Sequence, residues 1–167
     1  QTNELIYYST KNNVEVGSSL QTANAKPLNS LGITGSGMTA GVWDGGAAIP
    51  NHFSLVGRTQ IKDNGSAGFS STDISHATHV TGTVIANNFI PSAKGFAPQG
   101  SVWSYNWTSD ESEMTNAAAQ GLLVSNHSYG IDASQAGSAI PGIFGRYAVS
   151  SRAYDLIANA APYYTMV

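Results

Sequence analysis

Two kinds of hydrophobic pattern follow one another along this chain, short continuous apolar runs and longer stretches with helical spacing. Residues 38–43 form the first clear apolar run, which ends at Asp44 and predicts a short buried strand with a carboxylate at its carboxyl end. Between residues 76 and 87, apolar side chains recur on one side and predict a helix that carries the imidazole of His76 at its amino-terminal end. The glycine- and serine-rich residues 65–75 before it predict a flexible loop.

The same two patterns continue on both sides of this pair. Glycine, proline and capping residues mark where most of the segments begin or end. Residues 51–63 fit neither pattern clearly. We expect a short helix over 23–31, an alternating strand over 102–107, a helix over 109–120, a buried strand over 122–124, a helix over 146–160 and a strand over 163–167.

This alternation of strands and helices predicts the fold class. Short apolar strands separated by helices indicate right-handed crossovers, and therefore an α/β fold with a doubly wound, mostly parallel sheet and helices on both faces. Active sites in such folds lie beyond the carboxyl ends of the strands. Asp44, Asn106 and the segment 125–130 each lie at the end of a predicted strand, so we expect them to share one rim of the sheet.

The length of 167 residues fits a single domain that can bury a core without disulfides. We expect residues 1–22 to form an amino-terminal arm and residues 23–167 to form the folded domain. A parallel sheet whose last strand is 163–167 would keep an open edge and an uncovered apolar face. We therefore expect residues 23–167 to be the N-terminal part of a larger domain, which a separate C-terminal polypeptide completes.

Composition excludes several classes of function. The net charge is −3, only 10% of the residues are charged and no block of Lys or Arg occurs, so we expect neither a nucleic acid nor a membrane as a partner. The absence of cysteine excludes disulfides, thiolate zinc sites and a cysteine nucleophile. No apolar run reaches the roughly 20 residues of a membrane helix. The chain starts at Gln1 without a signal-peptide pattern, as a mature secreted protein or a trimmed one would, and we expect a secreted, extracellular protein.

Two motifs carry the candidate chemistry. Residues 42–46, Val-Trp-Asp-Gly-Gly, place an acid directly after a strand, and residues 76–83, His-Ala-Thr-His-Val-Thr-Gly-Thr, place a histidine at the start of a helix. An acid and a histidine in this arrangement supply two thirds of a hydrolytic triad. Both motifs resemble those of the subtilisin-like serine proteases, which have Asp followed by Thr/Ser-Gly and then His-Gly-Thr-His-Val-Ala-Gly-Thr. Residues 95–98 and 126–130 resemble further segments of that family, in the same order.

The resemblance implies a serine endopeptidase whose triad runs in the chain order Asp, His, Ser. Asp44 would accept the imidazole N–H of His76, and His76 would take the proton of the serine and return it to the leaving amine. The backbone of Ser128, Tyr129 and Gly130 would pair with an extended peptide substrate.

The resemblance also implies which residues form the opposite wall of the substrate cleft and whether the site requires a cofactor or a metal ion. Asn106, together with Thr108 and Ser109, would lie on that wall. No cofactor is required. Calcium, which many members bind through an Asn in the loop after the His helix, is not supported by Phe89 and Pro91 in that loop.

The chain departs from the family pattern at positions that matter for catalysis. Gly45 stands in place of the Thr or Ser beside the Asp, which removes a hydroxyl that supports the carboxylate. Nothing resembles the Gly-Thr-Ser-Met-Ala segment of the nucleophile, and the oxyanion Asn would follow Val167. We therefore expect activity only together with a C-terminal fragment of the same precursor, produced by cleavage, that carries the serine and the oxyanion Asn.

Other interpretations stay open beside this one. The chain could belong to a catalytically inactive, peptide-binding pseudoprotease that keeps the fold without the nucleophile. His76 and His79 lie at helical spacing and could hold a metal in a metal-dependent hydrolase, although no third ligand follows them. Asp44 could be a turn residue that caps the two glycines after it. We expect His79 to be a buried structural residue, and His52 and His127 to lie at the surface or to line the cleft.

Overall fold

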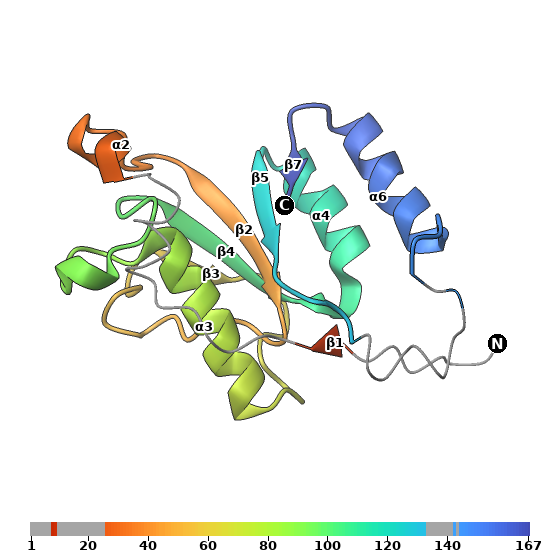
Figure 1. Cartoon of the computed structure of the whole chain (residues 1–167), viewed down its shortest axis with the longest axis horizontal. Helices are drawn as coiled ribbons and strands as arrows, with labels where there is room; N and C mark the ends of the chain where they lie inside the picture. The colour runs from red at the N-terminus through yellow and green to blue at the C-terminus, as the bar shows by residue number, and fades with distance from the viewer. Residues whose placement is uncertain (1–7, 10–25, 133–141, 143) are drawn as a thin grey trace.

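The computed structural model describes residues 8–9, 26–132, 142 and 144–167, and its centre is a five-stranded sheet (Figure 1). Neighbouring strands in this sheet are all parallel, in the order β3-β4-β2-β5-β7. The strands are β2 (Thr39–Asp44), β3 (Thr59–Ile61), β4 (Ser101–Asn106), β5 (Val124–His127) and β7 (Thr165–Met166).

Helices cover both faces of the sheet (Figure 1). α3 packs against β2 and β4 on one face, and α4 and α6 pack together on the other. The predicted α/β fold is therefore confirmed, with helical connections between parallel strands. No helix in the described part of the chain has both the length and the hydrophobicity that crossing a bilayer requires. The helices are α2 (Lys26–Ser30), α3 (Ser71–Ile85), α4 (Asp110–Ala119) and α6 (Val149–Ala160), with 3₁₀ turns η1 (Pro91–Ala93) and η2 (Trp107–Ser109).

The central strand β2 is buried on both faces, which explains its continuous apolar run. Val42 is fully buried and packs with Ile85 of α3. Trp43 is also fully buried but points to the opposite face, where it packs with Met114 of α4 and Ile157 of α6. A parallel strand between two helical layers needs apolar side chains on both faces. This burial fixes where the chain emerges at the carboxyl end of β2.

The helix that carries His76 begins earlier than the sequence pattern predicts, at Ser71. Ser70 Oγ accepts the backbone N–H of Asp73 at 3.2 Å, and the Asp73 carboxylate accepts the backbone N–H of Ser70 at 3.2 Å. This capping box satisfies two amides that a helix start leaves without partners. The predicted loop is therefore wrong for this first turn, because its Ser-rich composition is that of a helix cap.

Strand β5 begins later than the predicted apolar strand over 122–124. Gly121, with a φ of 92°, ends α4, and the N–H of Leu122 donates to the carbonyl of Ala117 at 3.0 Å. This hydrogen bond is of the kind that caps the C-terminus of a helix, so Leu122 belongs to the end of α4 and not to the strand. β5 itself, Val124–His127, consists mostly of polar residues.

A second sheet of two strands joins distant parts of the chain. β1 (Tyr8–Ser9) pairs antiparallel with β6 (Gly130–Ile131), directly after β5 (Figure 1). The rest of the predicted arm over 1–22, and residues 23–25 of the first predicted helix, lie outside the described residues.

Candidate active site

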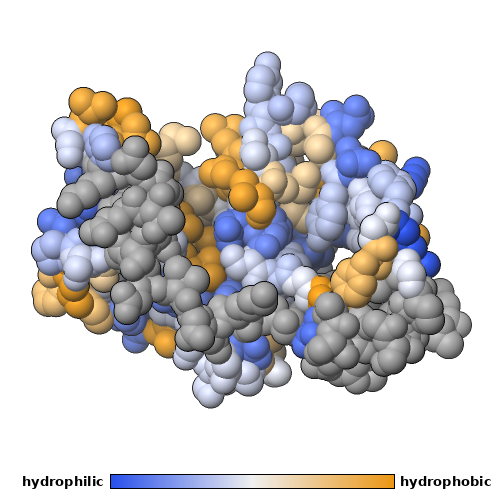
Figure 2. All heavy atoms as spheres, in the orientation of Figure 1, coloured by the Kyte–Doolittle hydropathy of each residue, from blue (hydrophilic) through white to orange (hydrophobic). Residues whose placement is uncertain are grey.

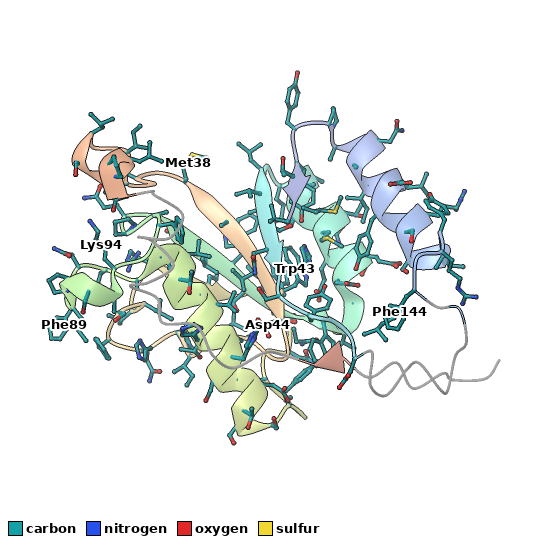
Figure 3. All side chains as sticks on the ribbon, in the orientation of Figure 1. Met38, Trp43, Asp44, Phe89, Lys94 and Phe144 are labelled. Atoms are coloured by element: carbon teal, nitrogen blue, oxygen red, sulfur yellow. The ribbon has the colours of Figure 1, made fainter. Side chains whose placement is uncertain are left out.

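The structure brings the two motif residues together at the carboxyl end of β2. Asp44 is the last residue of β2 and is 0% exposed, and His76 lies in the second turn of α3 and is 7% exposed. His76 Nδ1 is 2.9 Å from Asp44 Oδ1 and 2.9 Å from Oδ2. Figure 3 shows Asp44 beside α3 and Trp43 on the other side of β2. The side chains are therefore within hydrogen-bonding distance of each other.

The alternation of side chains along β2 produces this pairing. Val42 and Asp44 face α3, whereas Trp43 faces α4, because successive side chains of a strand point to opposite faces. Ala77, next to His76 in α3, is fully buried, and its small side chain lets the helix approach the sheet closely.

Burial dominates the electrostatics of the pair. Desolvation raises the pKa of Asp44 to about 6, although the hydrogen bond and charge of His76 and the backbone N–H of Gly45 oppose this rise. The Gly45 N–H donates to Asp44 Oδ1 at 2.6 Å. An ionised carboxylate only accepts hydrogen bonds, so it holds the imidazole in the form with a proton on Nδ1. Nε2 then keeps the lone pair that a general base needs.

The glycine beside the acid has a steric explanation in this fold. A Cβ atom on Gly45 would lie 3.0 Å from Asp73 Cβ and 3.1 Å from two ring carbons of Trp107. The Thr or Ser of the family pattern would fit only if these neighbours moved by a few tenths of an ångström. The carboxylate keeps backbone support from the Gly45 N–H instead of a side-chain hydroxyl.

Asn106 lies beside Asp44, but its amide group is engaged inside the protein. The two residues are register partners in β4 and β2, and Asn106 is 2% exposed. Its Nδ2 donates to Asn64 Oδ1 at 2.6 Å and to the Gly65 carbonyl at 3.1 Å, and its Oδ1 accepts the Thr108 N–H at 2.8 Å. The polar surface of this wall therefore comes from η2, in which Thr108 is exposed.

Residues Ser128–Gly130, which we call the edge segment, follow β5 directly. Ser128 Oγ accepts a hydrogen bond from Asn126 Nδ2 at 2.7 Å, and Tyr129 Oη donates to Asp110 Oδ2 at 2.7 Å. Gly130 is exposed and belongs to β6, which already pairs with Tyr8–Ser9. The backbone at Gly130 is therefore already paired with an antiparallel strand of this chain.

The remaining histidines differ in their surroundings. His127 is partly buried and stacks on Trp43, with ring centroids 5.2 Å apart. His79 is partly buried in α3, and His52 packs on Phe53 with ring centroids 4.4 Å apart. Within the described residues, no group of three or more His, Cys, Asp or Glu side chains could hold a metal ion.

A set of polar side chains around β5 belongs to neither of the two sequence motifs. Ser125, His127 and Tyr129 alternate along one face of the strand and its extension, and Asp110 of α4 contacts Tyr129. The sequence over 125–129, Ser-Asn-His-Ser-Tyr, is polar at every position and so does not mark this face. Only the packing of α4 against the face brings Asp110 to Tyr129.

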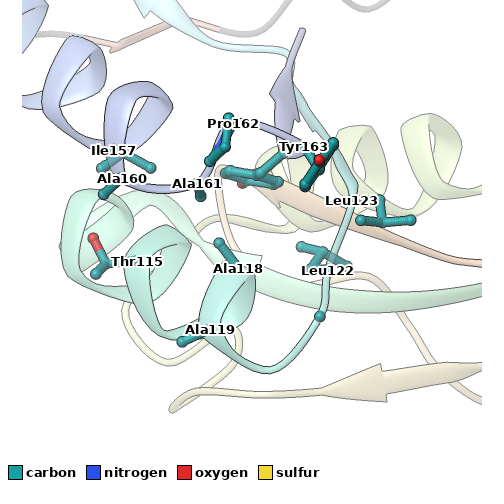
Figure 4. A pocket seen from close by; sticks show the side chains of 12 residues that line it. Thr115, Ala118, Ala119, Leu122, Leu123, Ile157, Ala160, Ala161, Pro162 and Tyr163 are labelled. Carbon is teal, nitrogen blue, oxygen red and sulfur yellow. The ribbon is translucent and has the colours of Figure 1, made fainter.

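An apolar cavity of about 470 Å³ lies far along the sheet from Asp44, at the amino ends of β5 and β7 (Figure 4). α4, α6 and the segments that lead into the two strands form its walls. Its lining includes Ala118, Leu122, Leu123, Ile157, Pro162 and Tyr163.

Comparisons with known proteins bear on this architecture. No protein-family model and no curated protein matches the sequence. The crystal structure of MycP1 with its N-terminal propeptide removed matches with a TM-score of 0.54 and 20% identity, over 91% of this chain and 47% of that one. This chain has a subtilisin-like fold. At this level of identity the likeness establishes the fold alone.

Two further structures match less closely. The MycP3 protease from the type VII (ESX-3) secretion system matches with a TM-score of 0.49 and 18% identity, over 71% of this chain and 38% of that one. The serine protease MycP1, a component of the type VII (ESX-1) secretion system, matches with a TM-score of 0.45 and 17% identity, over 71% and 40%. The chain thus spans between 38% and 47% of the length of these three structures.

Proposed function

We propose that this chain supplies the acid–base part of a subtilisin-like serine endopeptidase. The observation that carries the proposal is the contact of His76 Nδ1 with both oxygens of Asp44, at 2.9 Å each. The pair lies at the carboxyl end of a central parallel strand, where this class of fold has its active sites.

The proposed reaction uses the two residues in sequence. His76 Nε2 takes the proton of a serine hydroxyl as the serine oxygen attacks the peptide carbonyl. Asp44 stabilises the imidazolium that forms and holds its orientation. His76 then gives the proton to the leaving amine, and the same residues activate a water that hydrolyses the acyl-enzyme.

The proposed substrate is an extended peptide that adds to the edge segment as a further strand. Support comes from β1 and β6, since Gly130 already forms antiparallel pairing with a segment of this chain. Main-chain pairing of this kind binds peptides with little dependence on their sequence. The exposed Thr108 and Ser109 would line the other side of the cleft.

The nucleophile and the oxyanion Asn are proposed to come from a further polypeptide of the same precursor. Support comes from the sequence, which has no Gly-Thr-Ser-Met-Ala segment, and from the matched MycP1 structure, of which this chain covers 47%. No cofactor is part of the proposal. An extracellular location is also part of the proposal, and its support is the resemblance of residues 42–46 and 76–83 to the subtilisin-like serine proteases.

Labelling with a fluorophosphonate, followed by denaturing mass spectrometry, tests this proposal. We expect an adduct on a serine outside these 167 residues. His76→Gln should slow labelling by about a thousandfold or more, whereas the control His79→Gln, in the same helix, should change it by less than about threefold. An unlabelled second polypeptide would instead indicate a pseudoprotease that binds peptides. Hydrolysis that a chelator abolishes would indicate a metal held by the two histidines.

A further inference from the structure

A continuous chain of hydrogen bonds runs beneath the edge segment, on the face of the sheet that α4 and α6 cover. It links β5 to both helices and to the residue that precedes β7. The bonds join Tyr164 Oη to Ser125 Oγ (2.7 Å), Ser125 Oγ to His127 Nε2 (2.8 Å), His127 Nδ1 to Tyr129 Oη (2.9 Å), Tyr129 Oη to Asp110 Oδ2 (2.7 Å) and Tyr154 Oη to Asp110 Oδ2 (2.8 Å).

The chemistry of these groups fixes the direction of each proton. The carboxylate of Asp110 can only accept, so both tyrosines that contact it donate. Tyr129 has then used its proton, so His127 Nδ1 must carry a hydrogen and donate to Tyr129 Oη. His127 Nε2 is left as an acceptor for the hydroxyl of Ser125, which in turn accepts from Tyr164. Each group therefore has a matching partner when His127 is neutral.

Burial favours this neutral state. Desolvation lowers the pKa of His127 to about 4, although the charge of Asp110 opposes the shift. A second proton, on Nε2, would point at Ser125 and leave its hydroxyl proton without the acceptor it has now. Ser125 is 1% exposed, so water cannot easily replace that acceptor.

Packing holds the imidazole in place as well. β5 pairs with β2 so that His127 lies opposite Trp43, and the two rings stack at 14°. On its other side Trp43 stacks on Tyr105, with ring centroids 4.1 Å apart. We call the hydrogen-bonded chain from Tyr164 to Asp110 the relay. It is attached to the buried centre of the sheet at His127 and to the start of α4 at Asp110.

The relay contains a serine, a histidine and an acid, but it is not a second hydrolytic site. Ser125 is almost fully buried, so a substrate cannot reach its hydroxyl. Tyr129 also stands between His127 and Asp110, so the acid does not contact the imidazole. What the relay does contact directly is the edge segment, through the side chain of Tyr129.

We propose that Asp110, Tyr129 and His127 are positioning residues for peptide binding, because their relay holds the backbone of the edge segment in the extended form that pairs with a substrate. This inference rests on the proposed function. The hydroxyl of Tyr129 accepts a hydrogen bond from His127 Nδ1 and donates one to Asp110 Oδ2, and these two bonds anchor the side chain. With that side chain fixed, the backbone amide and carbonyl groups on either side of it have defined directions.

The test compares Tyr129→Phe with Tyr147→Phe in the full-length protein. Each variant removes one tyrosine–aspartate hydrogen bond, but the bond from Tyr147 to Asp155 lies on the exposed side of α6, away from the edge segment. Tyr129→Phe also removes the acceptor of the His127 Nδ1 proton. We expect it to raise KM for a cleaved peptide by about threefold to tenfold, with kcat within about twofold. Tyr147→Phe should change neither constant. Equal effects of the two variants, or a loss confined to kcat, would overturn the proposal.

Two further measurements do not depend on peptidase activity. Backbone amides of residues 129–131 should exchange with deuterium at least about tenfold faster in Tyr129→Phe, because the segment loses its anchor. Nitrogen NMR of the wild type should find His127 neutral with its proton on Nδ1, and a proton on Nε2 instead would contradict the relay. Asp110→Asn keeps the shape of the acceptor and should give a smaller KM increase in the same direction; an unchanged KM would count against the relay.

The outcomes separate this inference from the proposed function. A protein without a reactive serine fails the labelling test, yet faster exchange of the edge segment would still support the relay as the support of a peptide-binding edge. A labelled, active protein in which exchange and KM stay unchanged in Tyr129→Phe would keep the proposed function and overturn the relay.

Discussion

The buried carboxylate of Asp44 is proposed to act in its charged form, which lowers the stability of the folded protein. Asp44 is 0% exposed, and burial penalises the negative charge that the proposed reaction needs on its carboxylate. Natural active sites often retain such groups at the expense of folding stability. Because the pKa of Asp44 is raised from 3.8 to about 6, the cost of its charge in folding stability can be measured over this pH range.

The first prediction concerns stability against pH. The folded protein holds the Asp44 proton more tightly than the unfolded chain, so this stabilisation is complete below about pH 3.8 and is lost as the pH rises through about 6. Relative to Asp44→Asn, the wild type should therefore lose on the order of 2 kcal/mol of unfolding free energy between these values. Urea titrations from pH 3.5 to 8 measure this difference. Asp155→Asn, at an exposed carboxylate, is the control for the loss of one negative charge.

The second prediction concerns activity against pH. Protonated Asp44 cannot stabilise the imidazolium, so kcat/KM of the active protein should fall as the pH decreases through about 6, the raised pKa of Asp44. At neutral pH, Asp44→Asn should reduce kcat by about 10⁴-fold through loss of the imidazole tautomer. Stopped assays from pH 5 to 9 provide the profile. A rate that stays level down to pH 5 would show that Asp44 is not the partner of the general base.

At the scale of single elements, α3 and β2 show how local sequence sets the geometry of the site. The capping box of Ser70 and Asp73 starts α3, and the residues that follow place His76 one turn further on. In β2, Gly41 lets the rings and side chains of the α4 face close over the strand, since a Cβ there would lie 2.4 Å from Trp43 Cζ3 and 2.8 Å from Leu122 Cδ2. Both features can be tested by substitution.

Removal of the helix cap should destabilise the protein without touching the chemistry. Ser70→Ala loses the side-chain acceptor for the Asp73 N–H and should cost about 1 kcal/mol in unfolding free energy. The neighbouring Ser71→Ala, at an exposed position inside the first turn, should change stability by less than about 0.5 kcal/mol. Chemical denaturation of the two variants measures the contrast. Equal losses would mean that the capping box contributes nothing.

Two glycine substitutions should change stability in opposite directions. Gly41→Ala introduces a methyl group into the packed contact between Trp43 and Leu122 and should cost about 1–3 kcal/mol. Gly82→Ala, inside α3, meets nothing within 4 Å and should gain up to about 1 kcal/mol from helix propensity. Thermal unfolding of both variants decides between these signs, and a stabilising Gly41→Ala would contradict the close packing described for β2.

At the scale of the whole molecule, the two ends of the sheet differ in character. The rim at the carboxyl ends of β2 and β4 carries Asp44, Asn106 and the polar turn η2. Near the amino ends of β5 and β7 lies the open apolar cavity of about 470 Å³, with Tyr163 85% exposed beside it. Figure 2 shows further apolar side chains gathered over α2. Exposed apolar patches of this kind favour association.

The cavity should therefore cause the 167-residue chain to associate when it is purified alone. Replacing Leu123 and Tyr163 by Ser removes two exposed apolar walls and should lower the average particle mass in light scattering, with a change of less than about 0.5 kcal/mol in stability. Val149→Ser, at an 87% exposed position on α6 that does not line the cavity, is the control. Association that is unchanged in the double variant would exclude the cavity as its cause.

The parallel α/β architecture and the pairing of Asp44 with His76 could both be predicted from the sequence. Both depend on local signals: apolar runs that only a strand between two helical layers can use, and two motifs at the end of one strand and within the next helix. These signals can be recognised without knowing which distant residues they contact, because each lies within one short segment of the chain.

The surroundings of the other polar residues depend on contacts between elements that are distant in the sequence. Asn106 lies at the predicted rim, but the loop at residues 64–65 folds back and takes up both hydrogens of its amide. The surroundings of His127 could not be read from the sequence, because Trp43, on which it stacks, and Asp110, which it reaches through Tyr129, belong to other elements that come close only when the layers pack together. Hydrogen bonds between distant segments depend on the relative placement of whole elements, which no local pattern encodes.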